Sequence, residues 1–297
     1  MDKYDNLRAQ RIGFIGFGDI AQKAVDSLFA SPLHQGTGDA AKVLAFRRQP
    51  EKLNAQSPQL QALYADVTKP ETLSVLADAT VDYWVITLTP EAMTEAGYQA
   101  TYVKGLMHIL QALKGKQYKK LFWVSSSSVY GQAHDEWVDE TSATEPQRFS
   151  GQVQLAAEAL LADEARACVV RFSGIYRAEK HRMLDKLKQG QLPSGCEEDY
   201  YTNRIHVVDA ARSLLHLMHL DAAGTPIEPL YLASDSSPVK YLSLIQWLSD
   251  ARQLPLNTHL PAVKKRINSK RCSNARLKQS GFEFTYDTYQ AGFSSYQ

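Results

Sequence analysis

The feature that most constrains this chain is a glycine-rich turn near its N-terminus. An apolar run over residues 11–16 leads into Gly16-Phe17-Gly18-Asp19-Ile20-Ala21, and an amphipathic segment follows to about residue 30. This order predicts a strand, a tight turn and a helix whose free N–H groups hold the pyrophosphate of a dinucleotide. Gly16 would permit the sharp turn, Gly18 would let backbone approach a phosphate, and Ala21 would let the helix pack close to the strand.

The length and composition are those of an ordinary globular protein. A chain of 297 residues with 44% hydrophobic and 22% charged residues can bury a large core. The formal net charge of +1, without a long basic run, argues against nucleic acid or an anionic membrane as a partner. No stretch approaches the roughly 18 consecutive apolar residues of a membrane span. Cys168, Cys196 and Cys272 are far apart and odd in number, which predicts free thiols in a reducing cytoplasm.

Candidate cofactor contacts follow the second predicted strand. This strand is expected at residues 42–46, and Arg47-Arg48 comes directly after it. In dinucleotide-binding folds an acid near this strand end binds the ribose 2′-hydroxyl of NAD, whereas an arginine suits the 2′-phosphate of NADP. The arginine pair therefore favours NADP over NAD. The alternative is that two solvated charges open a polar loop.

Two further strand ends supply the remaining candidates. A short strand at residues 62–65 leads into Asp66-Val67, where a carboxylate commonly lies near the adenine in this architecture. A surface aspartate before a helix cap has equal support from the spacing alone. A strand at residues 81–87 leads to Thr89, which is also expected to contact the cofactor.

Three patterns predict helix starts. Residues 68–71, Thr-Lys-Pro-Glu, have the spacing of a capping box. Residues 89–91, Thr-Pro-Glu, place a cap before a proline at the first helical position, and the following segment to residue 114 has a helical pattern with room for a break at its glycines. Asp209 is predicted to cap a helix over residues 210–220.

A run of serines follows an apolar strand predicted at residues 121–124. The run reads Ser125-Ser126-Ser127-Ser128-Val129-Tyr130-Gly131. In an open α/β sheet the carboxyl ends of the strands face the ligand crevice, so these hydroxyls would hold a carbonyl or a sugar hydroxyl. The alternative is a serine-rich turn that satisfies its own backbone groups.

These motifs together resemble a known superfamily. The glycine turn and the serine run are joined by Arg171-Phe172-Ser173-Gly174-Ile175-Tyr176, by Asn203-Arg204-Ile205-His206-Val207-Val208-Asp209 and by Ser273-Asn274-Ala275-Arg276-Leu277. In this order they resemble the extended or atypical short-chain dehydrogenase/reductase superfamily, and more narrowly its NAD(P)-dependent epimerase/dehydratase branch, among members similar to sugar-nucleotide epimerases. The resemblance covers nearly the whole chain. It implies an α/β fold, with a Rossmann-like doubly wound parallel sheet and a smaller C-terminal substrate lobe.

The resemblance also implies a catalytic Ser or Thr and a Tyr-x-x-x-Lys pair, and the chain departs from that pair. Ser126 matches the catalytic Ser/Thr, but Ser150 and Gln154 occupy the usual tyrosine and lysine positions. A serine hydroxyl is a far poorer acid than a phenol, whose pKa is about 10, and glutamine carries no charge. The usual proton transfer therefore cannot be assigned to these two residues.

Three accounts of the departure are open. The first is a reaction that needs little proton transfer, and the second is nucleotide binding without catalysis. Otherwise another side chain is the acid or base, and Tyr130 is the most attractive because its motif contains Ser126. The full set of candidates for this role is Tyr130, His134, Tyr176, Tyr200, Tyr201 and His206.

We expect residues 1–175 to form the NAD(P)-binding domain and residues 176–297 to form mainly the substrate lobe, with parts returning to the main sheet. The implied function is that of an epimerase, dehydratase or reductase acting on a sugar nucleotide or a related small molecule. The alternative is a non-catalytic nucleotide-binding regulatory or sensor protein. The expected catalytic residues are Ser126 and Tyr130, and the expected cofactor contacts are Gly16, Gly18, Asp19, Ile20, Arg47, Arg48, Asp66, Val67 and Thr89.

The expected partners follow from the same observations. The cysteines and histidines do not have metal-ligand spacing, so no metal site is expected. The expected ligands are NADP, with NAD less favoured, and a small-molecule substrate. The long helices near residues 90–114 and 151–162 suit pairing across a homodimer, which is frequent in this superfamily.

Overall fold

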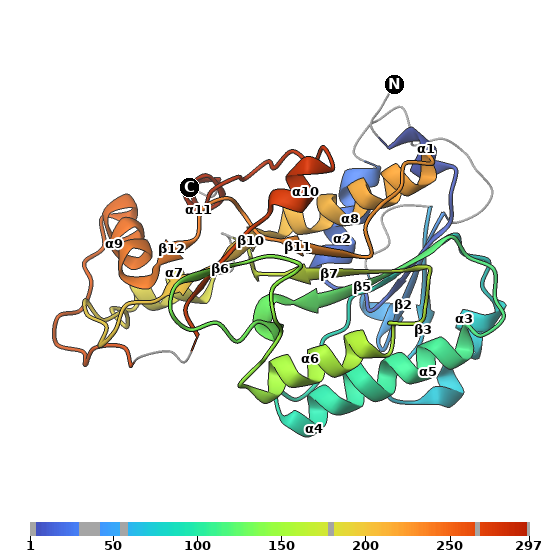
Figure 1. Cartoon of the computed structure of the whole chain (residues 1–297), viewed down its shortest axis with the longest axis horizontal. Coiled ribbons are helices and arrows are strands. Elements are labelled where there is room, and N and C mark those ends of the chain that lie inside the picture. Colours follow the sequence, from blue (N-terminus) through green and yellow to red (C-terminus); the bar gives the residue numbers. More distant parts are fainter. Residues whose placement is uncertain (1–3, 30–41, 54–58, 178–180, 265–267, 296–297) are drawn as a thin grey trace.

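The computed structural model describes residues 4–29, 42–53, 59–177, 181–264 and 268–295. At their centre lies a parallel sheet (Figure 1), made of β1 (Ile12–Ile15), β2 (Val43–Arg47), β3 (Leu60–Tyr64), β4 (Tyr83–Ile86), β5 (Lys120–Ser126), β7 (Ala167–Phe172) and β11 (Leu230–Ala233). The strand order is β11-β7-β5-β4-β1-β2-β3. The chain winds outward from β1 to β3, returns to β4 and winds outward the other way. This confirms the predicted Rossmann-like doubly wound sheet.

The central strands are apolar throughout because helices cover both faces of the sheet. Every residue of β1 and β4 is buried. The two strands are in parallel register, with Ile12 beside Tyr83 and Ile15 beside Ile86. Near-continuous apolar runs are the pattern of a parallel sheet that is buried on both faces.

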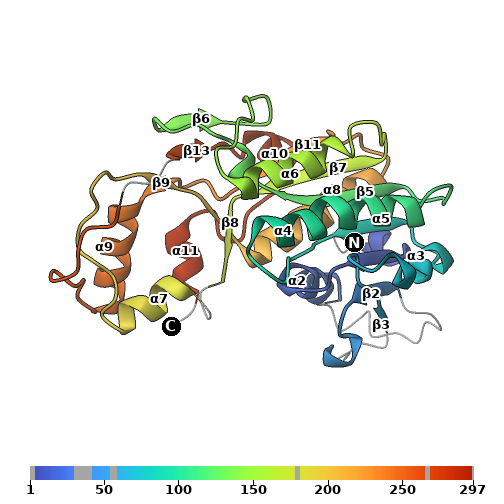
Figure 2. The same ribbon diagram turned by 90° about the horizontal axis from the view of Figure 1, so that it is seen from below.

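Two helical layers cover the sheet, as Figures 1 and 2 show. One layer contains α1 (Asp5–Arg8), α2 (Asp19–Leu28), α8 (Val207–Ala222) and α10 (Ala275–Gln279). The other contains α3 (Ser74–Asp78), α4 (Glu95–Tyr98), the π-helical segment η4 (Gln99–Lys104), α5 (Gly105–Ala112) and α6 (Phe149–Ala159). The buried face of α2 has helical spacing and consists of Ala21, Ala24, Val25 and Leu28.

Beyond the carboxyl ends of β5 and β7 the chain forms a smaller assembly. It contains β6 (Glu136–Val138), β8 (Gly174–Tyr176), β9 (Tyr201–Thr202), β10 (Arg204–His206), β12 (Val239–Lys240), β13 (Lys270–Cys272), α7 (Arg182–Lys188), α9 (Tyr241–Arg252) and α11 (Tyr289–Ser294). Its apolar core is separate from the two clusters that flank the main sheet. We call this apolar core the outer cluster. Its largest buried side chains are those of Tyr176, Tyr200, Tyr241, Tyr289 and Phe293.

The chain leaves the main sheet after β7 and returns to it as β11. β11 lies directly beside β7, with Leu230 opposite Val169 and Ala233 opposite Phe172. The helix that precedes β11, α8, packs on the same sheet face as α2. Part of the C-terminal half therefore completes the main sheet, while the intervening segment contributes to the outer cluster.

The long helical segment begins later than its sequence pattern predicts. Thr89-Pro90 does not start a helix; α4 begins at Glu95, and the Thr94 hydroxyl caps it by accepting from the Gly97 N–H. The helix then continues through η4 into α5 without interruption at its glycines. Four residues before Thr94 instead line a cavity described below, namely Thr87, Leu88, Thr89 and Glu91.

Two other predicted caps are wrong because their side chains have other partners. The Thr68 hydroxyl donates to Asp66 Oδ1, and after the 3₁₀ turn η3 (Pro70–Thr72) the helix α3 begins only at Ser74. Asp209 lies inside α8, which His206 caps. The Asp209 carboxylate instead accepts from the backbone N–H groups of Thr285 and Tyr286, so it fastens the C-terminal segment to α8.

The short 3₁₀ turns η2 (Pro50–Lys52) and η5 (Ser127–Val129) complete the described elements. No helix in the described part of the chain combines the length and the apolar character needed to cross a bilayer.

Candidate functional site

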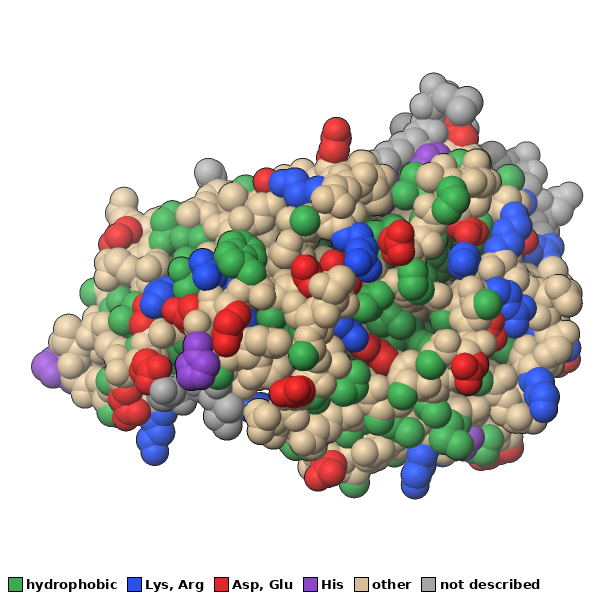
Figure 3. All heavy atoms as spheres, in the orientation of Figure 1, with side chains coloured by type: hydrophobic (Ala, Val, Ile, Leu, Met, Phe, Trp, Pro, Cys, Tyr) green, Lys and Arg blue, Asp and Glu red, His purple; other side chains and the backbone are tan. Residues whose placement is uncertain are grey.

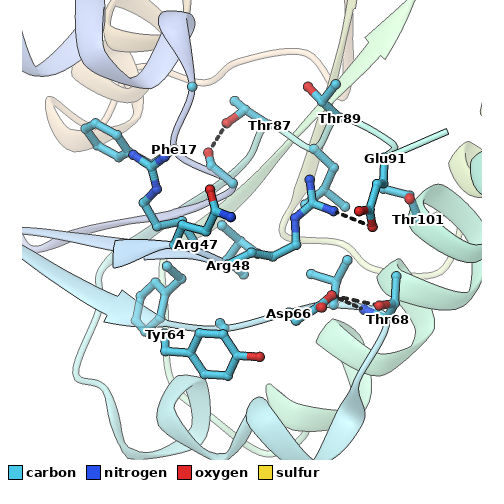
Figure 4. Close-up of a pocket in the computed structure, with 18 of the residues that line it drawn as sticks. Phe17, Arg47, Arg48, Tyr64, Asp66, Thr68, Thr87, Thr89, Glu91 and Thr101 are labelled. Atoms are coloured by element: carbon cyan, nitrogen blue, oxygen red, sulfur yellow. Dashed lines mark hydrogen bonds and ion pairs between the residues drawn. The ribbon is translucent and has the colours of Figure 1, made fainter. Parts of the chain in front are cut away.

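The first pocket lies at the carboxyl ends of β1 to β4, where the winding of the sheet changes direction (Figure 4). Its volume is about 510 Å³. After the glycine turn of β1, its walls come from the next three strand ends: Arg47 and Arg48, then Asp66 and Val67, then Thr89. Parallel strands present their following loops at one edge, so residues far apart in the sequence meet here.

The glycine turn forms one wall of this pocket. Gly16 has a φ of +84°, and a Cβ there would lie 2.4 Å from the Thr87 carbonyl oxygen. A Cβ on Gly18 would meet nothing within 4 Å. Helix α2 begins at Asp19 without a side-chain cap, so the N–H groups of its first turn remain available to a ligand. The open space at Gly18 and these N–H groups fit a pyrophosphate.

The arginines on the opposite wall have different surroundings. Arg48 forms an ion pair with Glu91, with 3.3 Å between Nη1 and Oε2, and both side chains are exposed. Arg47 also lines the pocket, and no ion pair of Arg47 occurs among the described residues. The described lining of this pocket contains three cations, Arg47, Arg48 and Lys69, and two carboxylates, Asp66 and Glu91.

The Asp66 segment is held by local hydrogen bonds. The Asp66 carboxylate accepts from the backbone N–H of Thr68 at 3.0 Å and from its hydroxyl at 2.7 Å. The Val67 carbonyl lies 2.8 Å from the His108 ring nitrogen. The loop is therefore fixed in position, although one Asp66 oxygen is occupied by the loop itself.

Two of the predicted cofactor contacts do not line this pocket, and several residues that do line it, among them Tyr64, Lys69 and Glu91, are not marked by the sequence patterns. Asp19 and Ile20 are absent from the pocket lining; Asp19 forms an ion pair with Arg177, at 3.0 Å, beside the end of β8. Tyr64 at the end of β3 does line the pocket, and it is 45% exposed. In the sequence, the feature that indicates Tyr64 is an aromatic residue near the end of the predicted third strand.

The second pocket lies beyond the carboxyl ends of β5 and β7, next to the outer cluster. Its volume is about 490 Å³. Among the described residues that line it, none is Asp or Glu, whereas Arg148, Arg204 and Lys270 are present. A polar pocket with cations and without carboxylates suits a ligand that carries negative charge.

The serine run contributes to this pocket and to its own turn. Ser126, Ser127 and Ser128 all line the pocket. The Ser126 hydroxyl accepts from the Ser128 N–H at 3.1 Å, and the Ser125 hydroxyl donates to Glu158 at 2.5 Å. Both interpretations of the run therefore have a place in the structure: Ser125 is structural, and Ser126 faces the pocket while capping η5.

Tyr130 lies behind the pocket rather than in its lining. Its side chain is fully buried, and its hydroxyl accepts from Arg171 Nη1 at 2.9 Å. Arg171 is in turn paired with Glu158 at 2.6 Å. Burial raises the pKa of Tyr130 to about 12, because the phenolate loses its hydration, although Arg171 opposes this effect. Tyr130 therefore belongs to a buried hydrogen-bond network with Arg171 and Glu158. The chemistry proposed below assigns no step to it.

Helix α6 presents Ser150 and Gln154 on the side that faces the sheet. Ser150 lines the second pocket. Gln154 is buried one turn later, and its Oε1 has no hydrogen-bond partner in the described part of the chain. Neither residue brings an acid of useful strength or a positive charge to the pocket.

The other candidate acids and bases are divided between places. Tyr176, Tyr200 and Tyr201 line the second pocket, and burial raises the pKa of Tyr176 above its usual range. His134 lines a separate cavity of about 330 Å³. The His206 ring caps α8 and packs against the Tyr286 ring at an interplanar angle of 57°, and it does not line the pocket.

Three titratable groups near this pocket were not identified from the sequence. Burial lowers the pKa of His181 to about 4 and that of Arg204 to about 10. Burial also lowers the pKa of Lys270, whose Nζ donates to the Tyr130 carbonyl at 2.9 Å. All three residues lie in segments after β7, where the sequence has no long apolar strand whose end would indicate a binding residue. Among the residues that the structure describes, no group of three or more metal-binding side chains gathers.

Comparisons with known proteins agree with this geometry. Residues 17–211 match a family model described as NAD(P)H-binding. A candidate NAD-dependent epimerase/dehydratase from Methylobacillus flagellatus is 32% identical, with a TM-score of 0.78 over 96% of this chain and 97% of that one. No curated protein matches the sequence.

Two more distant structures share the fold. UDP-glucose 4-epimerase from Thermotoga maritima, in complex with UDP-glucose, is 16% identical, with a TM-score of 0.75 over 95% of this chain and 96% of that one. The dTDP-glucose 4,6-dehydratase from Bacillus anthracis, in complex with NAD, is 16% identical, with a TM-score of 0.74 over 96% of this chain and 94% of that one.

Proposed function

The chain belongs to the NAD(P)H-binding family, in the epimerase/dehydratase branch of the short-chain dehydrogenase/reductase superfamily, and from this premise we propose that it is an NADP-dependent enzyme acting on a sugar nucleotide or a related small molecule. The first pocket would hold the cofactor and the second the substrate. The observation that carries the proposal is the uncapped start of α2 with open space at Gly18, opposite the two arginines of β2.

Each wall of the first pocket has a role in this proposal. The turn at Gly16 and Gly18 and the first N–H groups of α2 would bind the pyrophosphate. Arg47 and Arg48 would bind the 2′-phosphate of NADP, because guanidinium groups match phosphate geometry. The Asp66-Val67 segment would lie at the adenine.

The second pocket supplies what the substrate needs. NADP bound in the first pocket would supply hydride-transfer chemistry. In the second pocket Ser126 would orient a hydroxyl or carbonyl oxygen of the substrate, and the absence of carboxylates from its lining would favour an anionic compound. Sugar nucleotides carry such charge, and the epimerase from T. maritima binds UDP-glucose.

The division of labour between the parts of the chain belongs to the same proposal. Residues 1–175 would bind the cofactor, and residues 176–297 would mainly hold the substrate while contributing α8 and β11 to the main layers. The homodimer and the cytoplasmic location stay predictions.

Paired fluorescence titrations with NADPH and NADH test the cofactor. We expect NADPH to bind more tightly than NADH, and the Arg47→Ala and Arg48→Ala variants to lose about tenfold in NADPH affinity each, because a charge-assisted contact to phosphate is lost. NADH affinity should stay unchanged in both variants. Equal affinities of the wild type for the two cofactors would overturn the choice of NADP.

A sensor protein that binds NADP without catalysis is the second candidate. It is favoured by Ser150 and Gln154 in α6, which provide neither a phenol nor a cation, and by the burial of Tyr130. Turnover of UDP-glucose and of a panel of carbonyl compounds, followed by NADPH absorbance and by product chromatography, separates the two functions. Tight NADPH binding together with no turnover across the panel would support the sensor.

A further inference from the structure

A buried lysine in the second pocket lacks the counter-ion that usually accompanies such a group. Lys270 is 8% exposed, and it lines the pocket. Across the described ranges no carboxylate lines this pocket and no ion pair of Lys270 occurs. Burying an ammonium group without a counter-ion is costly, and structural lysines in proteins are usually paired or solvated. This free-energy cost of burial indicates that the positive charge of Lys270 has a function.

The backbone around Lys270 is fixed on both sides by one residue. The Asn203 side chain donates to the Lys270 carbonyl at 2.9 Å and accepts from the Cys272 N–H at 2.8 Å. Strand β13 is also paired with β6, with Lys270 beside Glu136. The lysine therefore projects from a rigid element, as a binding group should.

The ammonium group itself is only partly used by the protein. Its Nζ donates to the Tyr130 carbonyl at 2.9 Å, and Asn268 Nδ2 donates to the same carbonyl at 3.3 Å. An ammonium has three N–H donors. This hydrogen bond uses one donor and fixes the direction of the group, which leaves two donors for a ligand.

Helix α6 contributes no buried positive charge to this pocket. Gln154 is neutral and Ser150 is a weak acid, while Arg148 is exposed at the start of α6. Arg171 of β7 forms a buried ion pair with Glu158, so its charge is already paired. The buried cations among the described lining residues are therefore Lys270 and Arg204, which lie on the other wall.

We propose that Lys270 is the cation with which the second pocket binds its substrate, donating hydrogen bonds to an anionic oxygen of a phosphate or carboxylate group. The inference rests on the proposed function in taking the second pocket as the substrate site. It adds that the charge expected on α6 is supplied from β13 instead.

Acetylation with a trace of acetic anhydride, read by peptide mass spectrometry, tests whether Lys270 faces the pocket. The NADPH-loaded protein is labelled in its native state, with the exposed Lys114 as the internal reference. We expect native Lys270 to be acetylated and UDP-glucose to protect it at least about fivefold, without protection of Lys114. Acetylation of Lys270 only after denaturation would overturn the proposal.

Calorimetric titration of UDP-glucose then tests the charge. We expect Lys270→Gln to lose about tenfold or more in affinity, as loss of a charge-assisted hydrogen bond predicts. Lys270→Arg should retain most of the affinity, and the control Lys114→Gln should match the wild type. NADPH affinity and the melting temperature of each variant show whether the fold and the first pocket are intact. Unchanged UDP-glucose binding by Lys270→Gln would refute the assignment.

A wild-type protein that does not bind UDP-glucose would remove the sugar nucleotide from the proposed function without deciding the role of Lys270. In that case inorganic pyrophosphate and citrate are used as probes in the same protection experiment. Protection of Lys270 by either probe supports the inference. No protection by either one overturns it, even if NADPH binds tightly.

Discussion

One arginine–glutamate ion pair lines the first pocket and another lies behind the second, and the two pairs differ in burial. Arg48 and Glu91 meet at 3.3 Å at the first pocket, with side chains 47% and 90% exposed. Arg171 and Glu158 meet at 2.6 Å behind the second pocket, with side chains 7% and 9% exposed. Figure 3 shows that charged side chains are scattered over the visible face of the molecule, so exposed pairs are unremarkable there.

The difference teaches what each pair can contribute. An exposed pair is weak and is screened by salt, so Arg48 can exchange Glu91 for a ligand phosphate at little cost. A buried pair cannot be opened without leaving a charge unsolvated. Arg171 and Glu158 therefore fasten β7 to α6, while the charges that can meet a ligand in the second pocket come from other elements.

Breaking the buried pair should have the largest effect on stability. We expect Arg171→Met to lower the free energy of unfolding by about 3–5 kcal/mol, because Glu158 would remain buried without its partner. The matched variant Arg48→Met should change it by less than about 1 kcal/mol. Urea denaturation measures both, and equal effects would contradict the comparison.

The glycine turn separates stability from binding within the first pocket. Gly16→Ala should destabilise the protein by about 2–3 kcal/mol, because the residue has a positive φ and its Cβ would lie 2.4 Å from the Thr87 carbonyl oxygen. Gly18→Ala should leave unfolding unchanged, since no atom lies within 4 Å of its Cβ position. The same variant should nevertheless lose about tenfold in NADPH affinity, because the methyl group would occupy the space of the pyrophosphate. Unchanged NADPH affinity would mean that the phosphates bind elsewhere.

Asp235 makes the stability of the region behind the second pocket depend on pH. It is buried, and burial raises its pKa to about 7, with Arg204 opposing. The folded state therefore holds the proton more tightly than the unfolded state, whose pKa is about 4. The resulting stabilisation is present below pH 4 and is lost as the pH rises through 7. We expect the wild type to lose about 2 kcal/mol between pH 5 and pH 8 relative to Asp235→Asn, measured by urea denaturation at both pH values. Parallel pH profiles of the two proteins would show that Asp235 does not titrate in this range.

The smallest expected effect is at the exposed pair. Glu91→Gln should raise NADPH affinity about twofold to threefold at low salt, because Arg48 no longer has a competing carboxylate. The gain should vanish at high salt and should not occur with NADH. Glu95→Gln, at the exposed start of α4, is the control. A gain that persists in high salt would require another explanation than screening.

The first pocket was largely predictable from the sequence, whereas the second was predictable only in part, where Ser126 and three of the candidate tyrosines line it. Gly16, Arg47 and Asp66 each follow an apolar strand, so strand prediction alone places them at one edge of the sheet. Lys270 and Arg204 come from short strands outside the main sheet, where neither periodicity nor a strand end marks them. Their positions depend on pairings between distant segments, such as β13 with β6 and β10 with β8.

Local caps failed for a related reason. Thr68, Thr89 and Asp209 each have the residue type and spacing of a helix cap, but the pattern does not record competing partners. The Thr68 hydroxyl donates a hydrogen bond to Asp66, and the Asp209 carboxylate accepts hydrogen bonds from the N–H groups of two residues distant in the sequence. A capping pattern thus gives the capacity of a side chain, and the tertiary structure decides which acceptor or donor it meets.

The pairing of β11 with β7 has a consequence for how such a protein can change over evolutionary time. The chain departs from one strand and returns at its immediate neighbour, so both ends of the excursion are anchored at adjoining points of the sheet. Insertions, deletions or exchanges between these points alter one part of the walls of the second pocket while the sheet and the glycine turn stay in register. Descendants of one ancestral cofactor-binding scaffold could therefore change their substrates by replacing this stretch, while Ser126 and Lys270, which lie outside it, keep their places in the pocket.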